Sequence, residues 1–532
     1  MSSDPPQPDL DQLRRQAKKL RDAARSGDPA ALGRITAHVP AATAGTVTLA
    51  AAQLTIAREH GYPGWPRLVA EVRARAAERG QLVDEFLTAS VRDWTGRAAR
   101  MLARDPWIAG YDFRTAVVLG DAASAGQLLA RDPGLATAAD PRSGWTALHL
   151  ACASRWHRLD PARAAGLTEV ARLLLAAGAD PGARQGGAGG QWTPLLCAVA
   201  GEANAGITAL LLEHGARPDD HVLYLAAFDA SHESLRLLLP YAPDIAATTA
   251  LSAPISTGDV TAARLLLDAG ADPNRLLEAE LLGESHEQEP PVPPLSAAVA
   301  LEAGPELTGL LLEYGAAPDV PGPDGRTPYQ QAARSGQDQV AELLARHGAD
   351  TALSAADELL AACRRADRAA ATALLAADPG LAGRLSAGDY EALPGAADHG
   401  DTEAVRLMLD LGFPLGIRLV QDDGATALHL AAGAGSAATV RLLLERGAGV
   451  EARDTTWDST PLEWAIAGSG LRRGHDPHPD WPATVSALLD AGASTAGITL
   501  SADDPKPPSP EVAALLRARG IPEQEADSTA GD

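Results

Sequence analysis

A Leu-rich phrase that ends in Gly recurs along the chain and constrains the fold more than any other feature. It reads "VARLLLAAGADP" at 170–181, "AARLLLDAGADP" at 262–273 and "TVRLLLERGAG" at 439–449. Successive copies lie about 33 to 45 residues apart, or farther where a degenerate copy intervenes, and such a period indicates an array of repeated units. The glycines of the copies are Gly178, Gly215, Gly270, Gly315, Gly348, Gly412, Gly447 and Gly492.

Each part of this phrase has a physical reason. Apolar residues three and four positions apart form one face of a helix, which a neighbouring helix can cover. The Gly that follows can adopt the left-handed backbone conformation that ends a helix. An Asp-Pro or Ala-Pro after it prevents continuation and starts a turn. The phrase therefore predicts the second helix of a unit and the turn that leads to the next unit.

A second phrase, found upstream of the first, predicts the first helix of a unit. It reads "GWTALHLA" at 144–151 and "GATALHLA" at 424–431. Its Thr is placed to accept a hydrogen bond from an amide of the first helical turn, and Pro or Ala at the next position suits a helix start. The predicted caps are Thr146, Thr193, Thr327, Thr426 and Thr460.

The two phrases together resemble the ankyrin repeat, whose pattern is Thr-Pro/Ala-Leu-His-x-Ala, a helix, and then Leu-Leu-Leu-x-x-Gly-Ala-Asp. The segment at 426–454 is close to a complete copy of that pattern. The resemblance implies an all-α solenoid of helix–turn–helix units and a protein-binding role. It also implies that His149 and His429 are structural caps, each bonded to its Thr and to nearby backbone, and not general bases.

The strength of the repeat signal varies along the chain. It is strong over 146–220 and 426–500, whereas 224–244 and 359–382 keep two helices but lose the cap and the Gly. We expect about twelve units, because the period continues through the weaker copies. The predicted segments are a helical leader or cap at 1–81, degenerate repeats at 82–145, the main array with loop insertions at 146–500, a C-terminal half-repeat cap at 501–522 and a disordered tail at 523–532.

The N-terminal leader contains an amphipathic helix. Leu10, Leu13, Ala17, Leu20 and Ala24 form an apolar stripe that basic residues flank. A packed helical cap is favoured over a helix on a membrane surface, because the stripe is narrow and acidic residues are interspersed.

Composition limits the partners and the compartment. The net charge of −24 argues against nucleic acid, whose phosphates require clustered Lys and Arg. Lysine occurs only at Lys18, Lys19 and Lys506 whereas arginine is abundant, which is typical of a GC-rich bacterial gene. The three cysteines form no CxxC pair, and no secretion signal or long apolar run occurs. We therefore expect buried free thiols, a cytoplasmic location and no membrane partner.

No motif for a common catalytic site occurs in the chain. GxSxG, HExxH and GxxxxGK[ST] are absent. The Gly-rich stretch at 185–191 has no strand before it and no helix with Lys after it, so a turn tip is favoured over a phosphate site. We expect no enzyme, no catalytic residue, no cofactor and no metal.

Four insertions depart from the repeat pattern, and loops of this kind carry recognition more often than helices do. Those at 154–166 and 469–482 fall between the two helices of a unit, and those at 184–192 and 274–293 fall at the turn between units. The 469–482 loop holds His475, Asp476, His478 and Asp480. These side chains leave a metal- or small-ligand-responsive regulator as the alternative function, although an extended polar loop is favoured.

The function that the resemblance implies is a non-catalytic scaffold or adaptor. We expect a monomer that binds a protein partner on the concave face and the turn tips of the solenoid. Trp145 and Trp192 have two readings, since each precedes a Thr cap and either binds a partner or packs on the next turn. The candidate contacts, all expected to be exposed at turn tips, are Trp145, Trp192, Asp324, Arg326, Asp422, Asp423, Asp454 and Trp457.

Overall fold

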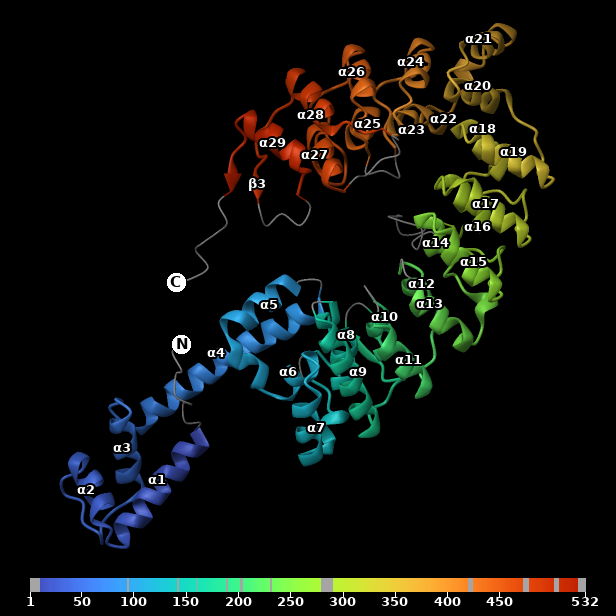
Figure 1. Ribbon diagram of the computed structural model, residues 1–532. Coiled ribbons are helices and arrows are strands. Elements are labelled where there is room, and N and C mark those ends of the chain that lie inside the picture. Colours follow the sequence, from blue (N-terminus) through green and yellow to red (C-terminus); the bar gives the residue numbers. More distant parts are fainter. Residues whose placement is uncertain are drawn as a thin grey trace. The chain divides into compact units, whose positions relative to one another are not determined.

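In a computed structural model, the chain forms two compact units, Met1–Arg217 and Pro218–Asp532 (Figure 1). Both units consist mainly of helices, and the strands found among the described residues are only two or three residues long. The all-α fold class is thus confirmed. The structure describes residues 10–92, 95–140, 143–158, 160–187, 190–200, 204–229, 232–278, 290–419, 424–471, 478–501 and 507–524.

The first unit starts with a helical segment and continues as a row of helical hairpins. The last three hairpins stack in a row. Their first helices (α6, α8, α10) pack side by side, and so do their second helices (α7, α9, α11). Its elements are α1 (Leu10–Arg25), α2 (Pro29–His38), α3 (Leu49–Glu59), α4 (Trp65–Val91), α5 (Thr95–Arg104), α6 (Phe113–Val118), α7 (Ala122–Arg131), α8 (Ala147–Ala153), α9 (Pro161–Ala176), β1 (Gln185–Gly187), β2 (Gly190–Trp192), α10 (Pro194–Val199) and α11 (Ala205–Glu213).

The second unit repeats this arrangement, with first helices on the inner side of an arc and second helices on the outer side (Figure 1). Its elements are α12 (Asp220–Ala226), α13 (Glu233–Leu238), α14 (Ser252–Thr257), α15 (Val260–Asp268), α16 (Pro294–Ala300), α17 (Gly304–Glu313), α18 (Pro328–Ser335), α19 (Asp338–Arg346), α20 (Ala355–Arg364), α21 (Arg368–Ala377), α22 (Ala387–Tyr390), α23 (Ala392–Asp398), α24 (Thr402–Asp410), α25 (Ala427–Gly433), α26 (Ala437–Glu445), α27 (Pro461–Leu471), α28 (Trp481–Asp490), β3 (Leu500–Ser501), α29 (Pro510–Ala518) and β4 (Glu523–Gln524).

The recurring Gly ends the second helix as its position predicts. Gly178 follows α9 with φ of 93°, and Gly447 follows α26 with φ of 89°. In this conformation the amide one position further on donates to a carbonyl of the last helical turn, as Ala448 does to Leu443. None of the helices in the described ranges combines the length and the hydropathy that crossing a bilayer requires.

The weaker repeats are capped by residues other than Thr. The Asp219 carboxylate accepts from the Val222 amide at the start of α12, and Ser354 forms a capping box with Asp357 at the start of α20. The prediction that these stretches lose the cap is therefore wrong, because Asp and Ser accept the same hydrogen bond as Thr.

The N-terminal leader packs as a bundle of its own. Leu13, Ala17, Leu20 and Ala24 of α1 are buried in one cluster with residues of α2 and α3. α4 is continuous from Trp65 to Val91, so the predicted segment boundary at 81 lies inside a helix. The core of the leader is therefore made by the apolar stripe that the sequence contains.

The insertion at 154–166 is not an exposed recognition loop, contrary to the prediction. Trp156 is buried, and its indole N–H donates to Ser90 Oγ at 2.9 Å. The Asp160 carboxylate accepts from the Ala162 amide, so the end of the insertion lengthens α9 by its first turns. The bulky indole buries apolar area against the end of α4, which explains why this segment folds inward.

Two short strand pairs, the last helix and the cysteines complete the fold. At the Gly-rich turn, β1 and β2 pair antiparallel with Gln185 opposite Trp192. Val512 and Leu516 of α29 are buried, whereas Glu523, placed in the predicted tail, pairs with Leu500. The three cysteines are free and buried as predicted, and burial raises the pKa of the Cys197 thiol to about 12.

Candidate protein-binding surface

A Thr-His pair begins α25 and links two successive repeats. The Thr426 backbone N–H donates to His429 Nδ1 at 3.2 Å, and the Thr hydroxyl oxygen lies 2.8 Å from the same nitrogen. His429 Nε2 lies 3.1 Å from the Ser459 carbonyl oxygen, just before the next repeat. Because Nδ1 accepts, the ring proton belongs on Nε2, which donates to that carbonyl.

The same geometry recurs at the start of α8. The Thr146 N–H donates to His149 Nδ1 at 3.3 Å, and His149 Nε2 lies 3.2 Å from the Trp192 carbonyl oxygen. Burial lowers the pKa of both His149 and His429, although their backbone hydrogen bonds oppose it. Both rings are therefore neutral near pH 7 with both nitrogens engaged, which does not suit a general base.

The remaining Thr caps lie at the predicted helix starts. Thr193 Oγ1 accepts from the amide three residues on at 3.1 Å, and Thr327 Oγ1 accepts from the Gln330 amide at 3.3 Å. At Thr460 the Glu463 carboxylate accepts in return from the Thr backbone N–H at 2.6 Å. These contacts satisfy amides that a helix start would otherwise leave unpaired.

Trp145 and Trp192 lie at neighbouring turn tips of the first unit and face each other. Their ring centroids are 6.2 Å apart, and the Trp145 ring is also 6.0 Å from the His149 ring. Both side chains are partly exposed. The indoles therefore pack across the turn, as one of the two readings predicts, and keep some accessible surface.

Trp457 is the most exposed of the candidate residues that the structure describes. Its side chain is 64% exposed at the tip of the loop between α26 and α27. Asp454, in contrast, is only 4% exposed, so the prediction that it lies on the surface is wrong.

The Asp454 carboxylate explains the shape of this loop. Its oxygens accept from the Trp457 amide at 2.6 Å, the Ser459 amide at 3.2 Å and the Trp464 indole N–H at 2.9 Å. Burial opposes ionisation, but these hydrogen bonds outweigh it and lower the pKa of Asp454. The Asp454 carboxylate therefore fixes the conformation of the loop that carries Trp457 through hydrogen bonds within the protein.

The preceding turn packs directly against this loop. Gly424 has φ of 69°, and a Cβ at this position would collide with the Thr455 side chain. Arg418 joins the two turns, because its guanidinium donates to the carbonyl oxygens of Gly424 at 2.7 Å and Arg453 at 2.8 Å. Adjacent turn tips thus support one another, and the Trp457 loop is held from both sides.

Asp324 and Arg326 lie at another turn tip of the second unit. They form an ion pair at 3.0 Å, and Asp324 is the more exposed of the two. Arg326 also lies 3.2 Å from the buried carboxylate of Asp389, so part of its charge is directed into the protein. Asp324 is therefore the more accessible candidate.

Sequence reasoning missed the charged cluster beside Arg326. Arg334 is buried between two carboxylates, 2.9 Å from Asp357 and 2.9 Å from Asp389. Both aspartates also close capping boxes, with Ser354 and Ser386. The patterns "SAAD" at 354–357 and "SAGD" at 386–389 are capping-box signatures that could have shown where the carboxylates lie.

Several predicted residues lie outside the described part of the chain, namely Asp422, Asp423, His475 and Asp476. Asp480, also in the 469–482 loop, caps α28 by accepting from the Ala483 amide at 3.0 Å. Among the residues that the structure describes, no group of three or more His, Cys, Asp or Glu side chains is placed to hold a metal ion.

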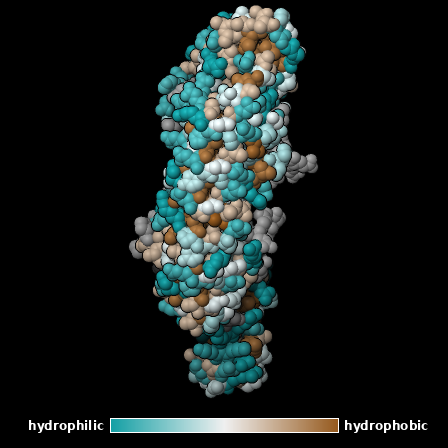
Figure 2. Space-filling view, turned by 90° about the vertical axis from the view of Figure 1, so that its right-hand side faces the viewer, coloured by the Kyte–Doolittle hydropathy of each residue, from teal (hydrophilic) through white to brown (hydrophobic). Residues whose placement is uncertain are grey.

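Figure 2 shows one face of the molecule, which is mostly hydrophilic, with hydrophobic residues in small separate groups. Such a face is typical of a chain with 69 acidic and 45 basic residues. Large exposed hydrophobic side chains are therefore informative, and Trp457 is the most exposed of them among the described residues.

Stacked helical hairpins with capped first helices and Gly-ended second helices define a helical repeat protein. Family models described as "Ankyrin repeats (3 copies)" match residues 359–454 and 393–472, and "Ankyrin repeat" matches 143–185 and 324–357. The chain is an ankyrin repeat protein.

Other comparisons find partial similarity. Inversin from Danio rerio is 40% identical over 77 residues, which are 14% of this chain and only 7% of Inversin. An ankyrin repeat domain from Acinetobacter baumannii AYE is 24% identical with a TM-score of 0.27, and covers 45% of this chain and 100% of its own. The human ASB11 ankyrin repeat domain is 22% identical with a TM-score of 0.21, and covers 46% and 98%.

Proposed function

We propose that this protein is a non-catalytic scaffold or adaptor that binds a protein partner on the concave face and turn tips of its repeats. Ankyrin repeats generally mediate protein–protein interactions. The observation that carries the proposal is the 64% exposure of Trp457 on a loop fixed by Asp454. A rigid, exposed indole gives large contact area at low entropic cost, and Trp dominates the energetics of many interfaces.

The other candidate residues have supporting roles. Trp145 and Trp192 offer a second aromatic contact in the first unit, because packing leaves part of each indole accessible. Asp324 and the net charge of −24 favour a partner with a basic surface. We further propose a cytoplasmic bacterial protein that is monomeric, has no enzymatic activity or cofactor, and binds neither nucleic acid nor membranes.

The experiment is affinity capture by the full chain from its native host, followed by mass spectrometry. We expect a stoichiometric partner that is lost with the Trp457→Ala variant or the Trp145→Ala/Trp192→Ala variant. Phe228→Ala is the matched control, because Phe228 is 44% exposed but lies two residues after the end of α12 and at none of the candidate turn tips. A partner that all variants retain, or no stoichiometric partner, would contradict the proposal.

A further inference from the structure

The layer of second helices in the second unit is interrupted at one place. α13, α15, α17 and α19 pack in sequence, and α24, α26, α28 and α29 pack in sequence. α21 lies between these two groups along the chain but packs on its own first helix, α20, while α24 also packs on α20. A cleft of about 800 Å³ lies between α19 and α21, where the packing of neighbouring second helices would otherwise continue.

The layer of first helices is also irregular in the region of the cleft. His399, after α23, contacts the carboxylate of Glu302, after α16, although 97 residues and two intervening hairpins separate them. Neighbouring helices are normally about 8–10 Å apart, so three regular repeat steps would keep these ends far from each other. The first-helix ends therefore converge, and α23 contacts both α18 and α20. On the outer side of the same region, α21 packs on α20 and the cleft lies between α21 and α19.

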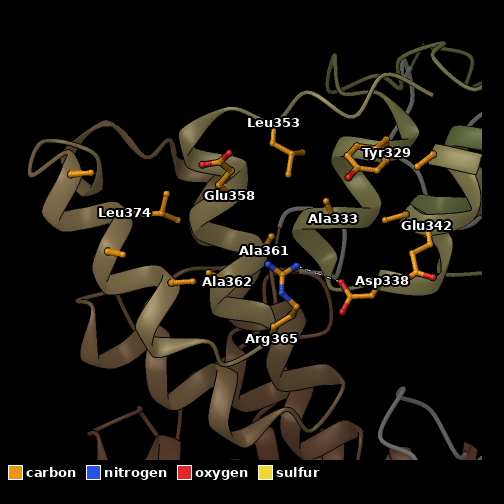
Figure 3. A pocket seen from close by; sticks show the side chains of 15 residues that line it. Tyr329, Ala333, Asp338, Glu342, Leu353, Glu358, Ala361, Ala362, Arg365 and Leu374 are labelled. Atoms are coloured by element: carbon orange, nitrogen blue, oxygen red, sulfur yellow. Dashed lines mark hydrogen bonds and ion pairs between the residues drawn. The ribbon is translucent and has the colours of Figure 1, made fainter. Parts of the chain in front are cut away.

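The walls of the cleft are made of small side chains. Eight of its fifteen lining residues are alanines, among them Ala345 on α19, Ala361 on α20 and Ala373 on α21. Figure 3 shows Leu374 and Glu342 on opposite sides, with Ala361 between them. Short side chains let a helix backbone approach closely, and α19 and α21 each offer about two to three turns of length.

The rim of the cleft is acidic. Asp338, Glu342 and Glu358 line it, and the one basic lining residue, Arg365, is already paired with Asp338 at 3.4 Å. Glu342 and Glu358 are exposed. An occupant with basic flanks would be attracted to this rim, whereas one with acidic flanks would be repelled.

We propose that the cleft between α19 and α21 is a second docking site, which binds an amphipathic helix of a partner protein with a Leu-like apolar stripe and Lys or Arg flanks. The site rests on the proposed protein-binding function but lies apart from the Trp457 loop. The incoming helix takes the place of the missing neighbour of α19. Its apolar stripe covers the alanines, and its basic residues face Glu342 and Glu358.

The experiment uses the full chain and three fluorescein-labelled 14-residue helical peptides with the same Leu stripe and with Lys, Gln or Glu flanks. Anisotropy titrations should show the order Lys, Gln, Glu from tightest to weakest. The cleft-filling variants Ala345→Trp and Ala373→Trp, on opposite walls, should each weaken the Lys peptide at least tenfold. Glu342→Lys/Glu358→Lys should weaken the Lys peptide and tighten the Glu peptide. Circular dichroism checks that each variant is folded.

Matched controls lie on α26, outside the cleft. Ala438→Trp and Glu445→Lys, both at exposed positions, should leave all three affinities unchanged. Absence of binding at 0.5 mM, equal binding of the Lys and Glu peptides, or unchanged binding to both filled variants overturns the docking site. Trp457→Ala should not affect the Lys peptide. If a captured partner is lost with Trp457→Ala but retained by both filled variants, the proposed function stands and the docking site fails.

Discussion

Single polar side chains determine the geometry of the turn tips. His429 joins the Thr426 cap to the Ser459 carbonyl. The Asp454 carboxylate accepts hydrogen bonds from amides of its own loop and from the Trp464 indole. Both side chains are buried and hydrogen-bonded. A buried polar group without such hydrogen bonds lowers the free energy of unfolding by about 1–3 kcal/mol. The polar residues that first suggest catalysis therefore serve to hold an exposed surface in one conformation.

His429→Ala should lower the free energy of unfolding of its repeat by about 1 kcal/mol, the usual cost of a lost cap. His429→Gln should cost less, because Gln at this position can accept from the Thr amide as Gln330 does from Thr327. Hydrogen exchange of the α25 amides, together with thermal denaturation, measures both effects. Equal protection in the wild type and the Ala variant would show that the imidazole is not a cap.

The stabilisation that His429 contributes should decrease at acidic pH. Burial lowers the pKa of His429 in the folded protein below the ordinary histidine value of about 6.5. Its contribution is therefore present above a pH of about 6.5 and is lost as the pH falls through the lower folded value. The stability difference between wild type and His429→Gln should therefore shrink between pH 7.5 and 5.5. A difference that stays constant over this range would contradict the assignment of a neutral ring.

At the scale of elements, buried charges hold α18, α20 and α22 together. Arg334 of α18 lies 2.9 Å from both Asp357 of α20 and Asp389 of α22. Burial disfavours ionised Asp389, but hydrogen bonds from Ser386 and the charge of Arg334 outweigh it and lower the pKa of Asp389. This cluster lies at the start of the α20–α21 hairpin, and the Glu302–His399 contact lies at the opposite ends of the first helices.

Arg334→Ala should destabilise the second unit by about 1–3 kcal/mol, because two buried carboxylates each lose a hydrogen-bonded cation at 2.9 Å and keep only Arg326, which lies 3.2 Å from Asp389 and 3.9 Å from Asp357. Arg334→Ala/Asp357→Asn/Asp389→Asn should recover part of the loss, since the amides remain hydrogen-bonding partners and carry no charge. Urea denaturation followed by circular dichroism compares the two. Loss of less than 1 kcal/mol in the single variant would mean that solvent or Arg326 replaces the Arg334 guanidinium.

His399 should show the opposite pH dependence from His429. Burial would lower its pKa, but the hydrogen bond and charge of Glu302 raise it overall. Its contribution is therefore present below a pH of about 6.5 and is lost as the pH rises through the higher folded value. The difference in Tm between wild type and His399→Gln should decrease from pH 6 to pH 8.5. An increase over this range would contradict the ion pair.

At the scale of the whole chain, the repeats and their caps follow from sequence, because each depends on contacts within a few residues. Thr146 caps α8 and Gly178 ends α9 for local reasons that the pattern contains. The exposure of Trp457 also follows from its place at a turn tip. The burial of Asp454 does not follow from its place in the sequence, because one of its hydrogen-bond donors, Trp464, belongs to the next helix.

The interruption of the second-helix layer at α21 could not be predicted from the repeat pattern. The stretch "LLAACRRADRAAATALLAADPGLA" gives two ordinary helices, whereas the charged contacts around them join residues that are far apart in sequence. Arg334 and Asp389 are 55 residues apart, and Glu302 and His399 are 97 residues apart. Pairings at such distances depend on how successive hairpins stack, which no local motif encodes.

The net charge of the chain predicts how its stability depends on salt. With a formal net charge of −24, repulsion between exposed carboxylates destabilises the folded repeats, and salt screens it. Raising NaCl from 20 to 300 mM should raise Tm by about 1–2 °C, which corresponds to about 1 kcal/mol for units of this size, because the entropy of unfolding grows with the number of residues. Glu342→Lys/Glu358→Lys, which adds 2 charges at each position and brings −24 to −20, should show a smaller rise. Differential scanning calorimetry measures both slopes. A Tm that falls with salt would mean that exposed ion pairs such as Arg34–Glu59, at 2.7 Å, outweigh the repulsion.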